Sequence, residues 1–271
     1  MTAPFKVRLT GSSSGTLDQV IVQIELVDRA ISNPCPLPWA WYRGDDIVGV
    51  DGTKFTTWVD RSGNNRTLDA WSGSADRHPT IIDSALDGQR GADFRDVADP
   101  YYAPADFEWE GDPTDFTGLS VFHVCLPTSG VWGAQDQVRL FGPERRILWT
   151  YINQPTGEPI DWYFEGATPD QPRGLAEGPP SPVIVEVHSY TDRLQVFYNA
   201  TEKLLSREQD LVTIEDSGAG AQEFPVSVTD LWHGGSGRSI VLETIIFSET
   251  LSPSCIAQWR SYLAARYPST G

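Results

Sequence analysis

The sequence predicts an all-β protein built as a two-sheet antiparallel sandwich. Short apolar or alternating segments recur along the chain, separated by turn residues at intervals of roughly 8–20 residues, as in sandwiches. With 24 Gly and 20 Pro, the composition favours turns over long helices. The 10 Trp, 9 Tyr and 11 Phe bury large areas and suit the half-buried surface of a sheet.

The first residues predict a β-hairpin arm. Residues 5–9 alternate apolar and polar, as a short strand does, and a stiff, proline-rich connector occupies 34–38. We therefore predict an N-terminal arm over 1–33, a possible anchor, and one sandwich domain over 34–271. The arm is too small to form a hydrophobic core by itself. It therefore either pairs with a neighbouring subunit or extends a sheet of the same chain. Four residues mark one face of its second strand: Val20, Val22, Ile24 and Leu26.

Strand-and-turn segments follow from residue 39 onward. The segment 166–182 is rich in Pro and Gly and is predicted to form a long loop. The predicted strands are 56–59, 80–82, 92–94, 119–125, 138–141, 147–151, 160–164, 183–190, 194–198, 211–214, 226–231 and 240–247.

One short helix is predicted near the C-terminus. Ser252 suits the N-cap, Pro253 fits the first helical position, and Pro268 ends the helix. Residues at spacings of three, four and four form its apolar face: Ile256, Trp259, Leu263 and Tyr267.

The segment from Trp58 to Asn65 reads W-V-D-R-S-G-N-N, and the pair Pro79-Thr80 and the triplet Ala92-Asp93-Phe94 follow it. With these motifs, residues 39–267 resemble the concanavalin A-like lectin/glucanase (laminin-G-like) jelly rolls found in phage virion proteins and bacterial surface proteins. The resemblance implies a jelly-roll sandwich built for display, a closing terminal helix, and calcium near one rim.

Charge and cysteine content exclude several classes. A net charge of −17 argues against a nucleic-acid partner, because no basic stripe is left to neutralise phosphates. No apolar run is long enough for a membrane span, and the N-terminus lacks a signal peptide's apolar stretch. Cys35, Cys125 and Cys255 are far apart and odd in number, so we interpret them as buried, unpaired residues made in a reducing cytoplasm.

No catalytic residue is predicted. The chain has no E-x-D-x-x-E string, no G-x-S-x-G elbow and no paired histidines. Asp161 with Glu165, or Glu186 with His188, could share a strand face, yet acidic residues are common enough for such pairs to arise by chance. If the protein is a glycoside hydrolase, Glu186 is the first choice.

Calcium is the candidate cofactor, because hard cations take carboxylate and carbonyl oxygens from loops. The candidate ligands are Asp45, Asp46, Asp60 and Asn64. The segment 60–65 is equally a hydrogen-bonded turn that closes a hairpin.

Glycan binding would use aromatic side chains in or beside loops, stacked on sugar faces. The alternative is that these rings pack into the ends of the β-sandwich. Trp109 is the leading candidate, because acidic residues surround it. The candidates are Trp109, Tyr101, Tyr102, Trp132 and Trp162.

Together these features predict a non-catalytic virion structural protein of a bacteriophage, such as a head-decoration, fibre or tail component. It would be made in the host cytoplasm, assemble as a homo-oligomer with other virion proteins through its arm, and contact surface polysaccharide, without nucleic-acid or membrane partners. The rival classes are a free bacterial glycan-binding module and a polysaccharide-cleaving enzyme.

Overall fold

The computed structural model describes residues 35–70, 78–94, 105–127, 137–141, 149–150, 160–163, 173–176, 182–189, 194–203, 226–235 and 239–270. The chain divides into two units, 1–34 and 35–271, and every described residue belongs to the second. The predicted strand 211–214 and the predicted arm lie outside the described residues, the latter with Val20, Val22, Ile24 and Leu26.

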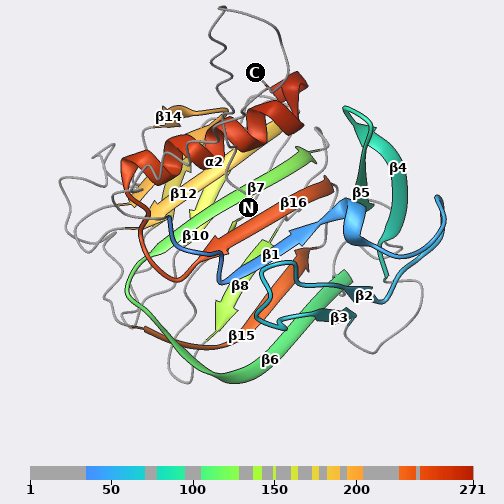
Figure 1. Ribbon diagram of the computed structural model, residues 1–271, viewed down its shortest axis with the longest axis horizontal. Helices are drawn as coiled ribbons and strands as arrows, with labels where there is room; N and C mark the ends of the chain where they lie inside the picture. The colour runs from blue at the N-terminus through green and yellow to red at the C-terminus, as the bar shows by residue number, and fades with distance from the viewer. Residues whose placement is uncertain are drawn as a thin grey trace, which may run out of the picture. The chain divides into compact units, whose positions relative to one another are not determined.

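Antiparallel sheets make up most of the second unit, which confirms the predicted all-β sandwich (Figure 1). The larger sheet has eight strands, with β1 (Ala40–Arg43) paired to β16. The order of the others is β14 (Thr201–Lys203), β13 (Leu194–Tyr198), β12 (Val183–Ser189), β7 (Leu119–Pro127), β16 (Ser239–Phe247), β5 (Gln89–Asp93) and β4 (Thr80–Leu86).

Two smaller sheets complete the described strands. The order in the five-stranded sheet is β2 (Thr57–Trp58), β3 (Leu68–Ala70), β6 (Ala105–Phe116), β15 (Val226–Gly235) and β8 (Gln137–Phe141). The order in the three-stranded sheet is β11 (Arg173–Ala176), β10 (Ile160–Tyr163) and β9 (Trp149–Thr150).

A hydrophobic core fills the space between the eight-stranded and five-stranded sheets. Val121 and Val185 enter it from the larger sheet, and Leu68 and Leu231 enter it from the smaller one; all four are buried. Removing such side chains from water is the main driving force for packing two sheets face to face.

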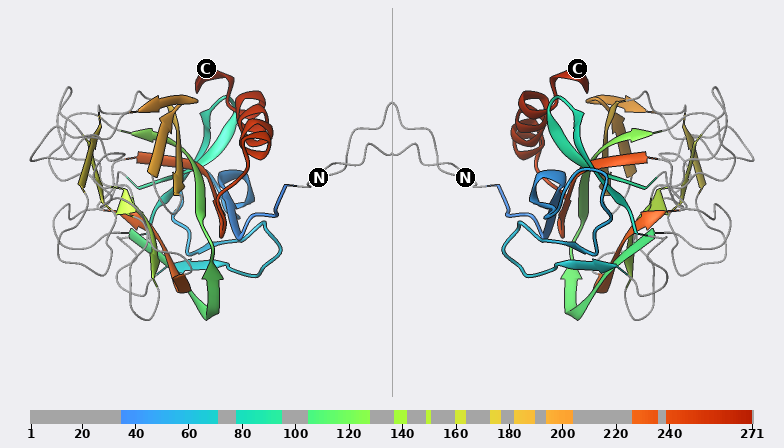
Figure 2. Two further views of the ribbon diagram at one scale, coloured as in Figure 1. Left: turned by 90° about the vertical axis from the view of Figure 1, so that its left-hand side faces the viewer. Right: turned by 90° about the vertical axis from the view of Figure 1, so that its right-hand side faces the viewer.

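The helix α2 (Pro253–Arg266) covers the other face of the eight-stranded sheet (Figure 2). The Ser252 side chain accepts a hydrogen bond from the Cys255 backbone N–H and so caps the helix, as predicted. The rings of Phe122 and Phe247 lie 6.4 and 5.4 Å from Trp259. The predicted apolar face is confirmed, since its members are buried: Ile256, Trp259, Leu263 and Tyr267.

Because both faces of the larger sheet are covered, β12 and β16 are buried along their whole length. In β12, Val183 and Val185 join the inter-sheet core, whereas Ile184 joins the cluster under α2. No described helix is long and apolar enough to cross a membrane.

The prediction of three unpaired cysteines is wrong for two of them. Cys35 and Cys255 form a disulfide that joins the first described residue to the first turn of α2. They are 220 positions apart in the sequence, and only the docking of α2 onto the sheet brings them together. Cys125 is buried, as predicted.

Several strands were absent from the sequence prediction. The segment 166–182 was predicted to be a loop but contains β11, which pairs with β10. The longest such strand is β6, whose alternation is hidden among many carboxylates. The others are β1, β3 and β14.

Candidate functional site

The five-stranded sheet has one face toward the core. Trp58, Leu68 and Leu231 are fully buried there, and Trp109 packs against the same cluster. Because successive residues of a strand alternate between faces, the positions next to these lie on the opposite face. We call it the outer face of the five-stranded sheet.

One cross-strand row spans this outer face through all five strands. Thr57 is paired with Asp69, and Asp69 with Glu108. Glu108 is paired in turn with Trp232, and Trp232 with Arg139. We call these five residues the outer row.

The rows on either side add three acidic positions. On one side, Glu110 is paired with Asp230, and Asp230 with Phe141. The other flanking row holds Asp106, Gly234 and Gln137. These three rows therefore contain one arginine position, Arg139, and five acidic positions: Asp69, Asp106, Glu108, Glu110 and Asp230.

Part of this face is open to solvent. Thr57, Asp69 and Glu110 are exposed. The Thr57 hydroxyl donates a 3.0 Å hydrogen bond to a carboxylate oxygen of Asp69. The remaining oxygen lone pairs of that carboxylate can accept hydrogen bonds from a bound molecule.

The chemistry of the outer row suits a polyhydroxylated ligand. An indole offers a broad apolar surface together with one N–H donor. Ionised carboxylates are acceptors only, so they complement hydroxyl donors. A sugar presents both an apolar C–H face and several hydroxyl groups, which matches this combination.

Sequence reasoning missed the outer row because its members come from five separated segments. The only local signal was the two-residue period in β6, where Phe107 and Trp109 alternate with Asp106, Glu108 and Glu110. The charged residues around Trp109 favour a position in or beside a loop, whereas the structure has a strand there.

Trp109 lies in β6, on the core side, and not in a loop as predicted. Its ring centroid is 5.5 Å from that of Trp39, edge to face, and the Arg66 guanidinium carbon is 5.2 Å from its ring. Gly111 allows this placement, because a Cβ there would lie only 2.3 Å from the Trp109 ring. Trp109 therefore packs against the core cluster, as in the alternative given above for the aromatic rings.

Of the other predicted glycan-binding aromatics, Trp162 alone lies among the described residues. Trp162 lies in β10, in register with Gly174 and Thr150 of the three-stranded sheet. Tyr101, Tyr102 and Trp132 lie outside the described residues. A role for these four in glycan binding stays a prediction.

Two of the predicted calcium ligands belong to a turn. The Asp60 carboxylate accepts hydrogen bonds from three backbone N–H groups and from the Ser62 hydroxyl, at 2.7–3.0 Å. The Asn64 side-chain amide donates to the backbone carbonyls of Pro38 and Trp39. These contacts join the turn between β2 and β3 to the start of β1.

The other two predicted ligands are paired with arginines. Asp46 forms ion pairs with Arg43 at 3.3 Å and Arg61 at 3.0 Å. Asp45 pairs with Arg266; burial opposes ionisation of Asp45, but a backbone N–H of β5 and the arginine outweigh it and lower its pKa. The described residues hold no group of three or more His, Cys, Asp or Glu suited to a metal ion. Calcium binding stays a prediction.

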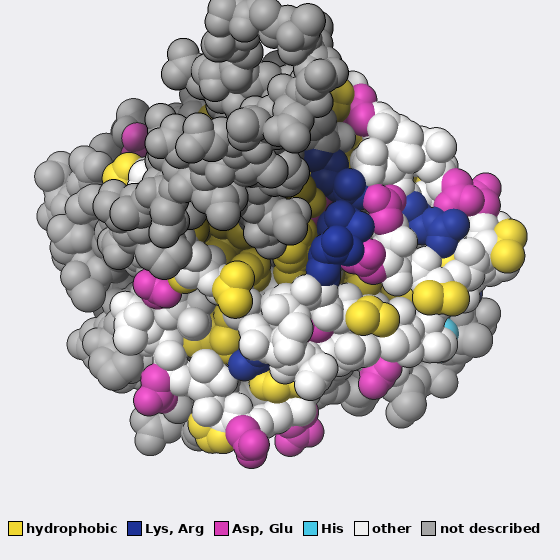
Figure 3. Space-filling view, in the orientation of Figure 1, with side chains coloured by type: hydrophobic (Ala, Val, Ile, Leu, Met, Phe, Trp, Pro, Cys, Tyr) yellow, Lys and Arg dark blue, Asp and Glu magenta, His cyan; other side chains and the backbone are white. Residues whose placement is uncertain are grey.

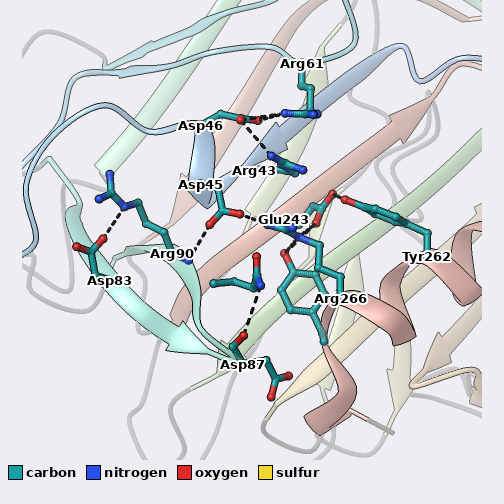
Figure 4. Close-up of polar contacts among 12 residues, drawn as sticks. Arg43, Asp45, Asp46, Arg61, Asp83, Asp87, Arg90, Glu243, Tyr262 and Arg266 are labelled. Carbon is teal, nitrogen blue, oxygen red and sulfur yellow. Dashed lines mark hydrogen bonds and ion pairs between the residues drawn. The ribbon is translucent and has the colours of Figure 1, made fainter. Parts of the chain in front are cut away.

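A buried carboxylate connects this network to α2 (Figure 4). Glu243 is fully buried and accepts hydrogen bonds from Trp41 Nε1 at 2.6 Å, Tyr262 at 2.9 Å and Tyr267 at 2.8 Å. Arg266 Nε lies 3.1 Å from its second oxygen. Burial raises the pKa of Glu243 despite these donors, and burial with the nearby Glu243 charge raises the pKa of Tyr262 to about 12.

A β-bulge explains why a glutamate reaches this position. The register of β16 against β7 shifts between Val241 and Glu243. Leu242 and Glu243 consequently both face α2, although they are consecutive residues.

Figure 3 shows a short strip of basic side chains bordered by acidic ones in the same view as Figure 1.

Glu186, the first choice for a catalytic carboxylate, lies beneath α2. It is 1% exposed, and Arg260 Nε lies 3.0 and 2.8 Å from its two oxygens. Nε2 of the buried His188 is 3.5 Å from Glu186, and its Nδ1 is 3.0 Å from the Ser120 hydroxyl. A glycosidase holds its carboxylates on either side of the bond to be cleaved. Glu186 instead forms an internal ion pair that holds α2 to the sheet.

Comparisons with known proteins support the fold. No protein-family model matches the sequence, and a search of curated proteins finds no match. A sialidase of Trypanosoma rangeli, solved in complex with sialic acid, aligns with a TM-score of 0.50 and 9% identity over 82% of this chain and 32% of the sialidase. The binding domain of botulinum neurotoxin serotype D aligns with a TM-score of 0.53 and 10% identity, over 83% of this chain and 51% of that chain.

Domain 4 of an extracellular GH43 arabinanase from Geobacillus stearothermophilus, in complex with arabinotriose, aligns with a TM-score of 0.49 and 13% identity. That alignment covers 83% of this chain and 98% of the arabinanase domain. The chain thus spans about a third of the sialidase, at 32%, and about half of the toxin domain, at 51%. At these identities the likeness is one of fold.

Proposed function

We propose that residues 35–271 form a non-catalytic carbohydrate-binding module of the concanavalin A-like type, which binds a sugar at the outer row. One observation carries the proposal. The register of the five-stranded sheet places Trp232 between Glu108 and Arg139, on the face that lies away from the core.

The arrangement meets the physical needs of sugar binding. Directly opposed residues in adjacent antiparallel strands have Cβ atoms about 5 Å apart, so Glu108 and Arg139 are the immediate neighbours of Trp232 on its two sides. A rigid sheet also fixes these positions before the ligand arrives, which reduces the entropy lost on binding.

The fold is compatible with such a role. The sialidase that shares it was solved with sialic acid bound. Since this chain aligns with only 32% of that enzyme, we take from it the architecture and not the ligand. The proposal therefore rests on the outer row.

The test is a glycan array probed with the full chain and with Trp232→Ala. The loss of a central aromatic contact typically costs about 2 kcal/mol, so we expect binding to weaken by about thirtyfold. Trp162→Ala is the matched control, because it removes the same side chain from the three-stranded sheet. Thermal unfolding of both variants should stay close to that of the parent.

Three results would contradict the proposal. Trp232→Ala would bind as tightly as the parent if sugars bind elsewhere, and a selective loss in Trp162→Ala would favour the three-stranded sheet. Released product in the same assay would point to hydrolysis.

We further propose that the module is displayed on a phage virion and that the arm, residues 1–33, anchors it. The proposal rests on the sequence resemblance and on the apolar face of Val20, Val22, Ile24 and Leu26. Deleting residues 1–33 should leave a folded domain with the parent's thermal unfolding but abolish oligomerisation or incorporation into particles. A truncated chain that does not fold, or one that still assembles, would contradict this proposal; normal assembly would favour a free glycan-binding module.

A further inference from the structure

The charges placed around Trp232 bear on which sugars bind there. We infer that the outer row selects glycans without acidic groups, neutral or amino sugars, over glycans that carry carboxylate, sulfate or phosphate. This inference rests on the proposed function and specifies the class of its ligand.

Acidic positions surround Trp232 along and across the strands. Glu108 is its cross-strand partner, and Asp230 lies two residues away on the same strand and face, about 7 Å distant. Glu110 is the partner of Asp230, and Asp69 is the next member of the row beyond Glu108. Acidic positions therefore adjoin Trp232 both along its own strand and across on β6.

The one arginine does not reverse this balance. Arg139 is paired with Trp232, and its diagonal neighbour across the same two strands is Asp230. Diagonal positions lie about 7–8 Å apart, within reach of a long side chain. The one basic position of the row is thus adjoined by an acidic position of the neighbouring row.

The consequence for a ligand follows from its charge. At physiological ionic strength, charges closer than about 8 Å are only partly screened, so an acidic substituent would be repelled by several carboxylates at once. Hydroxyl and ammonium groups donate hydrogen bonds and would be favoured by the same carboxylates. The net charge of −17 adds a long-range field of the same sign.

The test uses an array in which each neutral glycan stands beside its sialylated, sulfated or uronate derivative, such as lactose beside sialyllactose. We expect every acidic derivative to bind about tenfold or more weakly than its neutral parent. This difference in affinity should become smaller as salt is added. An acidic derivative that binds as tightly as its parent would overturn this inference and leave the proposed function intact. Absence of binding to any glycan would overturn both.

A pair of variants links the selectivity to these residues. Glu108→Gln combined with Asp230→Asn should reduce the ratio of the affinities for neutral and acidic derivatives by a factor of about three or more. The matched control is Glu202→Gln with Glu249→Gln, which removes two exposed carboxylates outside the five-stranded sheet. If the control reduces this ratio as much, net charge and not the outer row sets the selectivity, and the inference fails.

Discussion

At the scale of single residues, two buried carboxylates organise local contacts: Asp60 closes the turn between β2 and β3, and Glu243 joins the sheet to α2. The Asp60 carboxylate accepts hydrogen bonds from the backbone N–H groups of Ser62 and Arg66, a few positions along the chain, so the W-x-D-x-S-G-N pattern predicts this turn. The hydrogen bonds from Asn64 to the carbonyls of Pro38 and Trp39 reach outside the turn and could not be predicted. Glu243 carries no such signal. It lies within an apolar strand, and its partners are near residue 41 and in α2, about 20 positions further along the chain.

Glu243 yields a prediction about pH. Its folded-state pKa lies above its ordinary value of 4.5, mainly because of burial. The folded protein therefore binds this proton more tightly, and the contribution to the free energy of unfolding falls as the pH rises from 4.5 through the raised pKa. Glu243→Gln removes this titration, so its free energy of unfolding, measured against that of the parent, should rise over the same range. Urea unfolding at several pH values measures the difference, and a flat or falling difference would contradict the account.

At the scale of elements, periodicity decided what could be predicted. The helix α2 shows a clear apolar face and a capped start, and it occurs where expected. In contrast, β6 is interrupted by Gly111 and Pro113 and faces the core with only some of its residues, so its composition resembled a loop. The disulfide was missed because three widely spaced cysteines contain no pairing information.

The disulfide should stabilise the docking of α2. Closing a loop of 220 residues restricts the unfolded chain, which corresponds to about 2–5 kcal/mol. Cys35→Ser with Cys255→Ser should lower the free energy of unfolding by this amount under oxidising conditions. The free energy of unfolding of the parent should fall by the same amount when reductant is added. That of the double variant should not change with reductant. A parent protein equally stable in both states would show that the link contributes nothing.

At the scale of the whole molecule, the sandwich could be predicted but its candidate site could not. The core between the sheets depends only on the alternation of apolar residues, which the sequence displays. The outer row depends on the order and register of five strands, drawn from positions 57 to 232. Neither order nor register follows from local patterns when the connections are long.

The most direct measurement of the central claim is an NMR titration of the ten tryptophan indole N–H signals with the glycan that binds on the array. The Trp232 signal can be assigned from the spectrum of Trp232→Phe. We predict that the Trp232 signal shifts with saturation, while those of Trp162 and the core residue Trp58 stay unchanged. A Trp232 signal that remains fixed while another indole responds would show that the sugar binds elsewhere and would contradict the proposed site.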